Sequence, residues 1–381
     1  MEEPSLDPAR QEKAREYARI RWRLTFGELA LGGCFLLFLL ASGLSLRLRA
    51  SLDYPWPLGI ALYFMVVMLG YGLLSLPLTF YGGFTLPRRY GLSTQSLGGW
   101  LADIAKASMV GLVLGVVVVV AIYWLLAATP ETWWLWAALF VILLSVVLAN
   151  LAPILILPLF FKLRPLNDAE LEARLVRLAQ RAGAKVRSVF TMDFSAKSTG
   201  ANAALIGLGN TRRIVLADTL FGRYSPDEIE VILAHELGHQ VHHHIPKLIA
   251  IQSASTLVGF CLAGLALGWA VPWLGYSSIA DPAAFPLLAL VLALFALLIG
   301  PLMSAYSRRL ERSADSYALA LSDNPAGFVQ MMTKLTNQNL SESQPSRWVK
   351  LFYDHPAYLE RVALARRYEA SRSQRNPGGV L

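Results

Sequence analysis

The sequence predicts a mainly α-helical membrane protein that crosses the bilayer about six times and carries a small α+β domain. First, the 381-residue chain is 55% hydrophobic and only 16% charged, whereas soluble domains carry roughly 25% charged residues. Second, six apolar stretches each reach the ~18 residues that a membrane helix requires. Third, the region after the fourth stretch has the short amphipathic patterns of a mixed helix and strand domain. Together these observations argue against an ordinary soluble fold, in which such stretches would be buried core helices.

The apolar stretches divide the chain into five regions. The stretches are Leu29–Leu46, Tyr54–Pro87, Ala107–Pro130, Thr132–Phe161, Leu248–Ala280 and Pro282–Ser307. We expect a basic N-terminal segment, a four-helix membrane region, a soluble insert, two further membrane helices and a C-terminal part, at residues 1–24, 25–161, 162–247, 248–307 and 308–381. The basic segment from Asp7 to Leu24 is compatible with either an interfacial helix or a solvated helix.

The distribution of lysine and arginine predicts the orientation. Residues 1–24 hold six of them and residues 88–106 hold three, whereas the loops on the other side hold only Arg47 and Arg49. Short loops rich in lysine and arginine stay in the cytoplasm, so we expect both termini and the soluble insert there, on a bacterial inner membrane or a eukaryotic endoplasmic reticulum membrane. The net charge of +8 then indicates contact with anionic lipid head groups and not with nucleic acid. The sequence does not predict the oligomeric state.

The soluble insert begins with a helix and continues with short strands. Apolar residues at helical spacing predict a helix from Asp168 to Gly183. Runs with strand character follow at Val186–Met192, Ala203–Ile206 and Arg213–Ala217. The glycines in Gly207–Asn210 predict a turn before the last of these strands. The insert is therefore a small α+β domain.

A His-Glu-x-x-His motif follows the strands. Ser225-Pro226-Asp227-Glu228 has the pattern of a capping box with proline at the first helical position, and it predicts a helix that includes the motif. Residues four apart lie on one face of a helix, so His235 and His239 can bind one metal ion. Glu236 lies beside that ion, where a carboxylate can take a proton from water. The two cysteines lie within predicted spans, which leaves no thiolate site or disulfide framework.

Two histidines leave a zinc ion in need of a third ligand. Glu311 is our candidate, on a helix that continues from the last span, although a solvated charged face would give the same pattern. Asp315, four residues later, then suits a hydrogen bond to a zinc-binding histidine. His242 and His243 are expected to be solvated helix-end residues, and the role of His244 stays open. Two histidines, one carboxylate and an open position form a catalytic and not a structural zinc site.

With these residues placed, the chain resembles the CAAX prenyl protease 1 family of integral-membrane gluzincin zinc proteases, and more distantly the HtpX membrane proteases. The resemblance covers most of the chain from about Gln11. The segments that carry it are His235–His239, Glu311–Asp315 and His355–Val362, with further similarity at Ser198–Ala203, Ile214–Leu220 and Tyr90–Gly98.

The resemblance implies a membrane-embedded, zinc-dependent metalloendopeptidase. It implies one Zn²⁺ per chain on the two histidines and Glu311, with Glu236 as base, and substrates that are membrane proteins or membrane-associated or C-terminal peptide segments. It further implies that the strand at Asn202 and Ala203 pairs with the substrate backbone. His355, as oxyanion donor, and Arg361 are implied to lie near the reacting carbonyl.

The sequence departs from the family pattern at two points, and two rival functions are also considered. Six spans are expected where seven are typical, and Ala204 stands where an aromatic residue is common. One rival is an HtpX-like protease that degrades damaged membrane proteins. The other is a membrane scaffold or transporter with a vestigial metal site, which Asn150 inside a span would fit. Glu236 favours an enzyme, because a site that only binds metal needs no general base.

Overall fold

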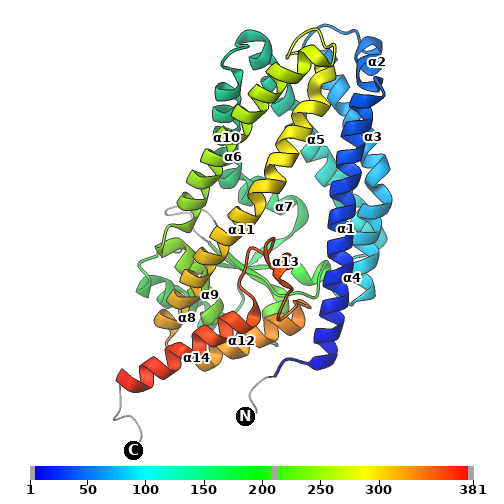
Figure 1. Ribbon diagram of the computed structural model, residues 1–381. Helices are drawn as coiled ribbons and strands as arrows, with labels where there is room; N and C mark the ends of the chain where they lie inside the picture. Colours follow the sequence, from blue (N-terminus) through cyan, green and yellow to red (C-terminus); the bar gives the residue numbers. More distant parts are fainter. Residues whose placement is uncertain (1–4, 185, 187, 207–212, 376–381) are drawn as a thin grey trace, which may run out of the picture.

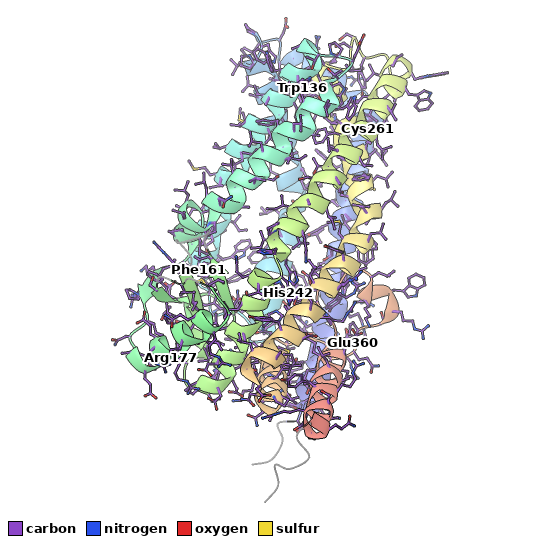
Figure 2. The ribbon with its side chains drawn as sticks, turned by 90° about the vertical axis from the view of Figure 1, so that its left-hand side faces the viewer. Trp136, Phe161, Arg177, His242, Cys261 and Glu360 are labelled. Atoms are coloured by element: carbon purple, nitrogen blue, oxygen red, sulfur yellow. The ribbon has the colours of Figure 1, made fainter. Side chains whose placement is uncertain are left out.

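The computed structural model describes residues 5–184, 186, 188–206 and 213–375. Long helices run side by side through one end of the molecule, and a small sheet with shorter helices forms the other end (Figure 1). Trp136 and Cys261 lie in the helical part, whereas Arg177 and Glu360 lie in the opposite part (Figure 2). The helices are α1 (Pro8–Ala41), α2 (Leu44–Ser51), α3 (Leu58–Phe80), α4 (Leu86–Arg89), α5 (Leu97–Ala128), α6 (Trp133–Leu155), α7 (Leu157–Phe160), α8 (Ala169–Arg181), α9 (Pro226–Val241), α10 (His244–Trp273), α11 (Phe285–Ser322), α12 (Pro325–Gln338), α13 (Arg347–Lys350) and α14 (Tyr358–Arg375).

Six helices in the described part of the chain are long and apolar enough to cross a membrane, which confirms the expected number. They are α1, the continuous helix Leu58–Arg89 that contains α3 and α4, α5, α6, α10, and α11 with the short helical turn that begins at Pro282. Large apolar side chains on these helices point outward, and Leu69, Met109, Leu265 and Leu298 are each 65–70% exposed. An apolar surface of this extent is unfavourable in water but matches the hydrocarbon of a bilayer. The chain is therefore a multi-pass membrane protein.

Helix α1 includes the basic N-terminal segment. It continues through that segment from Pro8 into the first span, so the segment is not a separate helix. Tyr17 is buried there against Leu340 of the C-terminal part. The helix also ends at Ala41 and not at Leu46, because Gly43 adopts a left-handed conformation with φ of 67°.

Other spans also have boundaries that differ from the prediction. Helix α5 begins at Leu97, ten residues before the expected start, because the Ser96 side chain accepts the backbone N–H of Gly99 as an N-cap. Helix α11 continues from the last span to Ser322, as expected for the helix that carries Glu311 and Asp315. Asn150 donates to the carbonyl of Val146 at 2.7 Å, so its side-chain amide has a hydrogen-bond partner within its own helix.

The sheet has four strands in the order β1-β2-β4-β3. The three predicted strands are present as β2 (Ser188–Met192), β3 (Ala203–Ile206) and β4 (Arg213–Ala217), whereas β1 (Leu163–Pro165) was not predicted. The turn expected at 207–210 lies outside the described residues. Strands β2 and β4 are parallel, and the two outer pairs are antiparallel. In the described part of the chain, strand β3 therefore lies at an edge of the sheet, with one side free to pair with another strand.

One face of this sheet packs on the soluble helices. Val189, Ile214 and Leu216 are at most 1% exposed and form a core with residues of α8 and α9. The predicted helix after Asp168 is confirmed as α8, with the Asp168 side chain accepting the backbone N–H of Leu171 at 2.9 Å. This core holds α9 beside the edge strand, and α9 carries the His-Glu-x-x-His motif.

Candidate active site

The motif lies in the middle of α9, and the start of that helix is fixed as the sequence predicts. The Ser225 side chain accepts the backbone N–H of Glu228, and the Glu228 carboxylate accepts the backbone N–H of Ser225 at 2.7 Å. This capping box satisfies two backbone donors at the helix end. Ten residues later His235 and then His239, one turn apart, point to the same side of α9.

Helices α9 and α11 are in close contact at the motif. A Cβ added to Gly238 would lie 2.9 Å from the Cα of Ala314. Two carbon atoms this close would clash, so one of the helices would have to move. Ala234 and Ala318 are also fully buried. Small residues on both helices thus allow the two backbones to approach, and this places Glu311 of α11 opposite the two histidines.

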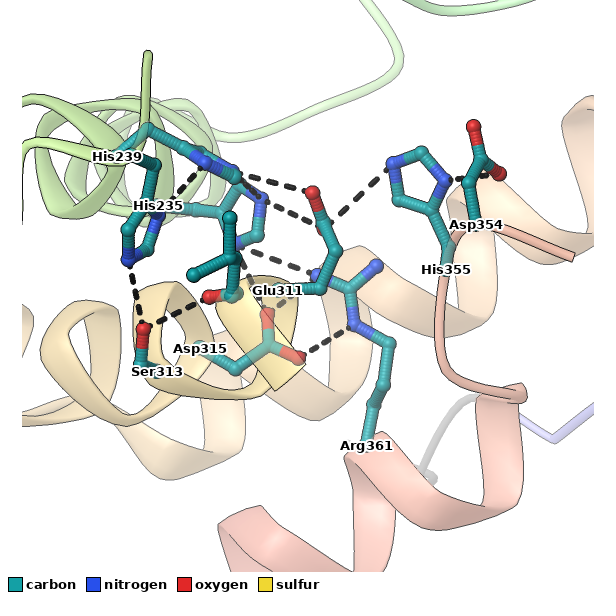
Figure 3. Close-up of polar contacts among 10 residues, drawn as sticks. His235, His239, Glu311, Ser313, Asp315, Asp354, His355 and Arg361 are labelled. Atoms are coloured by element: carbon teal, nitrogen blue, oxygen red, sulfur yellow. Dashed lines mark hydrogen bonds and ion pairs between the residues drawn. The ribbon is translucent and has the colours of Figure 1, made fainter. Parts of the chain in front are cut away.

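The ligand atoms of the expected zinc set converge (Figure 3). The Nε2 atoms of His235 and His239 are 3.2 Å apart, and the carboxylate oxygens of Glu311 lie 3.4 Å from the first and 3.3 Å from the second. Tetrahedral ligands at typical zinc distances are separated by roughly 3.3 Å. The geometry therefore fits one small metal ion between the three side chains.

The donor chemistry of this set also fits zinc. Glu311 is 6% exposed, and among the described residues its Oε2 atom has no hydrogen-bond partner. A buried carboxylate oxygen without a partner is unfavourable unless a cation binds it. In the described part of the chain, this is the one group of three such side chains near enough to hold a metal.

Asp315 and Arg361 surround His235. The Nδ1 atom of His235 donates to Asp315 Oδ1 at 2.9 Å, so its Nε2 lone pair faces the site. Arg361 of α14 donates from Nε to Asp315 Oδ2 at 2.8 Å and pairs with the other oxygen through Nη2. Asp315 is fully buried, and this ion pair balances its charge. Arg361 thus lies against Asp315, and its Nη2 atom is 3.4 Å from the His235 ring.

The pKa of His235 shows how strongly the carboxylates act on this ring. Burial alone would lower it, but the hydrogen bond to Asp315 and the nearby Glu311 carboxylate outweigh burial and raise the pKa to about 9. The two carboxylates therefore favour a proton on the His235 ring. A metal ion must displace that proton when it binds.

Glu236 and His355 face a cavity of about 190 Å³ beside the converging ligands. Burial raises the pKa of the Glu236 carboxyl, and the neighbouring rings of His235 and His239 act in the opposite direction. His355 Nε2 lies 3.5 Å from Glu311 Oε2, and His355 Nδ1 hydrogen-bonds Asp354 at 2.8 Å. That hydrogen bond raises the pKa of His355, against the effect of burial. The cavity thus holds a carboxylate base and a hydrogen-bond donor.

Asn202 and Ala203 line the same cavity, at the start of edge strand β3. The sequence did not reveal what holds this strand in place. Asn339, just after α12, accepts the backbone N–H of Ala201 at 2.8 Å, and Gln338 donates to the carbonyl of Thr199 at 2.8 Å. No local pattern marks these two side chains, because their partners are more than 130 residues away in the chain.

The three histidines after the motif have different environments. His243 is exposed at the junction of α9 and α10, as expected. His242 is half-buried against the Tyr317 ring, so the expectation that it is solvated is only partly met. His244, whose role was open, is 1% exposed, and its Nδ1 atom is 3.0 Å from the Nδ1 atom of His239.

Comparison with known proteins agrees with this geometry. The N-terminal model of CAAX prenyl protease, described as five membrane helices, matches residues 3–162, where the described residues contain four candidate spans. The metalloprotease YhfN of Bacillus subtilis is 28% identical over 96% of this chain and 87% of its own. CAAX prenyl protease 1 of Saccharomyces cerevisiae is 29% identical over 76% of this chain and 68% of its own.

The fold also matches a solved structure. The crystal structure of S. mikatae Ste24p has a TM-score of 0.81 and 24% sequence identity, and the match covers 94% of this chain and 89% of that one. This match supports the arrangement of long helices around a small sheet domain. A model of peptidase family M48 matches residues 165–369, which is more than half of the chain. The chain is therefore a membrane metalloprotease that belongs to peptidase family M48.

Proposed function

We propose that the protein is a zinc-dependent endopeptidase that hydrolyses membrane-associated or C-terminal peptide segments, in the manner of CAAX prenyl protease 1. The observation that carries this proposal is the convergence of His235, His239 and Glu311 at mutual distances of 3.2–3.4 Å. These three side chains would hold one zinc ion. When bound, zinc supplies a Lewis acid that polarises the scissile carbonyl and makes water more acidic.

Glu236 is the proposed general base. It follows a ligand in the sequence, lines the cavity without belonging to the converging set, and carries a carboxyl group whose pKa is raised by burial. A carboxylate with a raised pKa is a better proton acceptor near neutral pH. Glu236 takes the proton of the attacking water and then passes it to the leaving amine.

His355 is the proposed donor to the oxyanion that forms on the attacked carbonyl. Its ring lines the same cavity as Glu236, and Asp354 orients it through Nδ1, which leaves Nε2 to donate. Asp315 and Arg361 act through His235. Asp315 accepts its Nδ1–H, and Arg361 donates to the Asp315 carboxylate, so the Nε2 lone pair of His235 is directed to the metal position.

The free edge of β3 is the proposed binding site for the substrate backbone. A peptide that adds to this edge as a further strand passes Asn202 and Ala203 and reaches the cavity that contains Glu236. Strand β3 also borders an apolar cavity of about 470 Å³, lined by residues such as Ala204, Val215 and Phe160. Successive side chains of a strand point to opposite faces, so a bound peptide has room for an apolar group on this side.

We also propose that the site and both termini lie in the cytoplasm. The support is the excess of lysine and arginine in segments 1–24 and 88–106, whose described residues lie at the same end of the molecule as the sheet domain (Figure 1). Residues 1–24, 88–106, 162–247 and 308–381 would then be cytoplasmic. The 162–247 insert and the C-terminal part form the catalytic domain together, because α9 from the first packs on α11 and α12 from the second.

The rival functions have less support. The matched N-terminal model and the yeast relative are those of CAAX prenyl proteases, so an HtpX-like role is not favoured. A scaffold or transporter with a vestigial site does not fit a chain of a metalloprotease family that retains Glu236 in the cavity.

Hydrolysis of a fluorogenic peptide by the full chain in lipid vesicles tests this function. We expect turnover that a zinc chelator abolishes and added zinc restores. Glu236→Gln should retain zinc but lose about 10²–10⁴-fold in turnover. Glu230→Gln is the matched control, because Glu230 lies on the same helix and pairs with Arg174 outside the cavity. Hydrolysis that resists the chelator, or full turnover by Glu236→Gln, would refute the proposal.

A further inference from the structure

We propose that His244 is a positioning residue, which together with Ser313 fixes the proton on His239 so that its Nε2 lone pair faces the metal. This inference rests on the proposed zinc site and goes beyond it. Neither Asp315 nor Arg361 contacts His239 in the described structure; both act on His235. His239 therefore needs an orienting partner of its own.

The backbone at the end of α9 brings His244 to His239. On a continuous helix, residue 244 would lie about 140° around the axis from residue 239, on another face. The chain instead breaks at His243, whose φ of 53° is left-handed. Only a few per cent of residues other than glycine adopt this conformation. The break starts α10 in a new direction, and the His244 ring returns to within 5.0 Å of the His239 ring, centre to centre.

The direction of each hydrogen bond follows from the groups involved. The Ser313 hydroxyl donates to the carbonyl of Leu310 at 2.8 Å, and a carbonyl can only accept. The Ser313 oxygen is then an acceptor for His244 Nε2, at 2.9 Å. His244 therefore carries its proton on Nε2 and has an acceptor at Nδ1. That acceptor takes the Nδ1–H of His239 at 3.0 Å, and the Nε2 lone pair of His239 is left for the metal.

The two metal-binding histidines are thus oriented in different ways. His235 donates to a buried carboxylate, whereas His239 donates to a buried neutral ring that helix α11 holds through Ser313. Loss of an orienting partner of this kind typically costs about 10–100-fold in metal affinity. We expect removal of the His244 ring to weaken metal binding by the same factor, although this ring touches neither the metal position nor the cavity lined by Glu236.

Zinc affinity of the purified full chain, measured by competition with a chromogenic chelator, tests the role of His244. His244→Phe keeps a ring of similar size but removes the acceptor, and we expect about 10–100-fold weaker zinc binding. His244→Asn places an amide oxygen near the position of Nδ1 and should restore most of the affinity. Ser313→Ala removes the group that fixes the His244 proton and should give an intermediate loss.

His243→Asn is the matched control, because it changes the adjacent, exposed histidine and asparagine tolerates a left-handed backbone. Its zinc affinity should equal that of the parent. Thermal unfolding of the metal-free variants shows whether each chain is folded. If folded His244→Phe binds zinc as tightly as the parent, or if the Asn and Phe variants lose affinity equally, His244 does not position His239. If the parent itself binds no zinc, the proposed function fails instead.

Discussion

Gly238 of α9 and Ala314 of α11 are in backbone contact, and this contact sets the distance between the two helices that carry the metal ligands. A Cβ on Gly238 would lie 2.9 Å from the Cα of Ala314 and 3.1 Å from its carbonyl oxygen. Backbone atoms cannot move aside as a flexible side chain can. The glycine of the motif therefore has a packing role, which differs from the chemical roles of its neighbours His235, Glu236 and His239.

Gly238→Ala should separate the two helices and weaken the metal site. Overpacking of this kind costs about 1–3 kcal/mol in stability, and zinc affinity should fall because Glu311 moves away from the histidines. The control is Gly268→Ala in α10, where an added Cβ meets nothing within 4 Å. Zinc titration and thermal unfolding of both variants check this. Parent-like zinc affinity in Gly238→Ala would show that the contact does not set the site geometry.

The sequence predicted the elements whose signals are local. The capping box at Ser225, the histidine spacing and the strand at Arg213–Ala217 each depend on neighbouring residues, and each is confirmed. Strand β1 at Leu163–Pro165 was missed, because three residues that include a proline show no strand pattern by themselves. Its pairing with β2, about 25 residues later, makes it a strand.

Parts of the site were not predictable for the same reason. The contact of His244 with His239 needs a left-handed residue at His243, and the usual glycine signal for such a break is absent. Ser313 lies within the Glu311–Asp315 segment that carries the family resemblance, but nothing in its sequence context indicates that it contacts a ring on another helix. Arg361 was expected near the reacting carbonyl, and its bidentate pairing with Asp315 required the position of α14.

The basic side of the pH profile should depend on His355. Its pKa is raised, first by the hydrogen bond with Asp354, so His355 stays protonated above its ordinary range. Its stronger donation to the oxyanion is present below that pKa and is lost as pH rises through it. Asp354→Asn should therefore move the basic limb of kcat/KM to lower pH.

Two further variants complete this test. His355→Ala should lower kcat by about 10²–10³-fold while zinc is retained. Asp323→Asn is a control, because that carboxylate pairs with Arg372, outside the cavity. An unchanged basic limb in Asp354→Asn, together with parent-like turnover in His355→Ala, would remove His355 from the mechanism.

The orientation is testable with single cysteines in a chain from which Cys34 and Cys261 have been removed. Ser278, in the loop between α10 and α11, is exposed and should react with a membrane-impermeant maleimide added outside. Ser373, on α14, should react only after the membrane is opened. The opposite pattern would place the catalytic domain outside the cytoplasm.

The metal content of purified protein tests the central claim most directly. The parent should contain about one zinc ion per chain, as a site with three protein ligands and one open position requires. Glu311→Ala should lose it, because two histidines alone leave the metal without its carboxylate. Glu360→Ala removes a carboxylate on α14 that pairs with Lys350, and it should keep the zinc. Full zinc occupancy in Glu311→Ala would contradict the account.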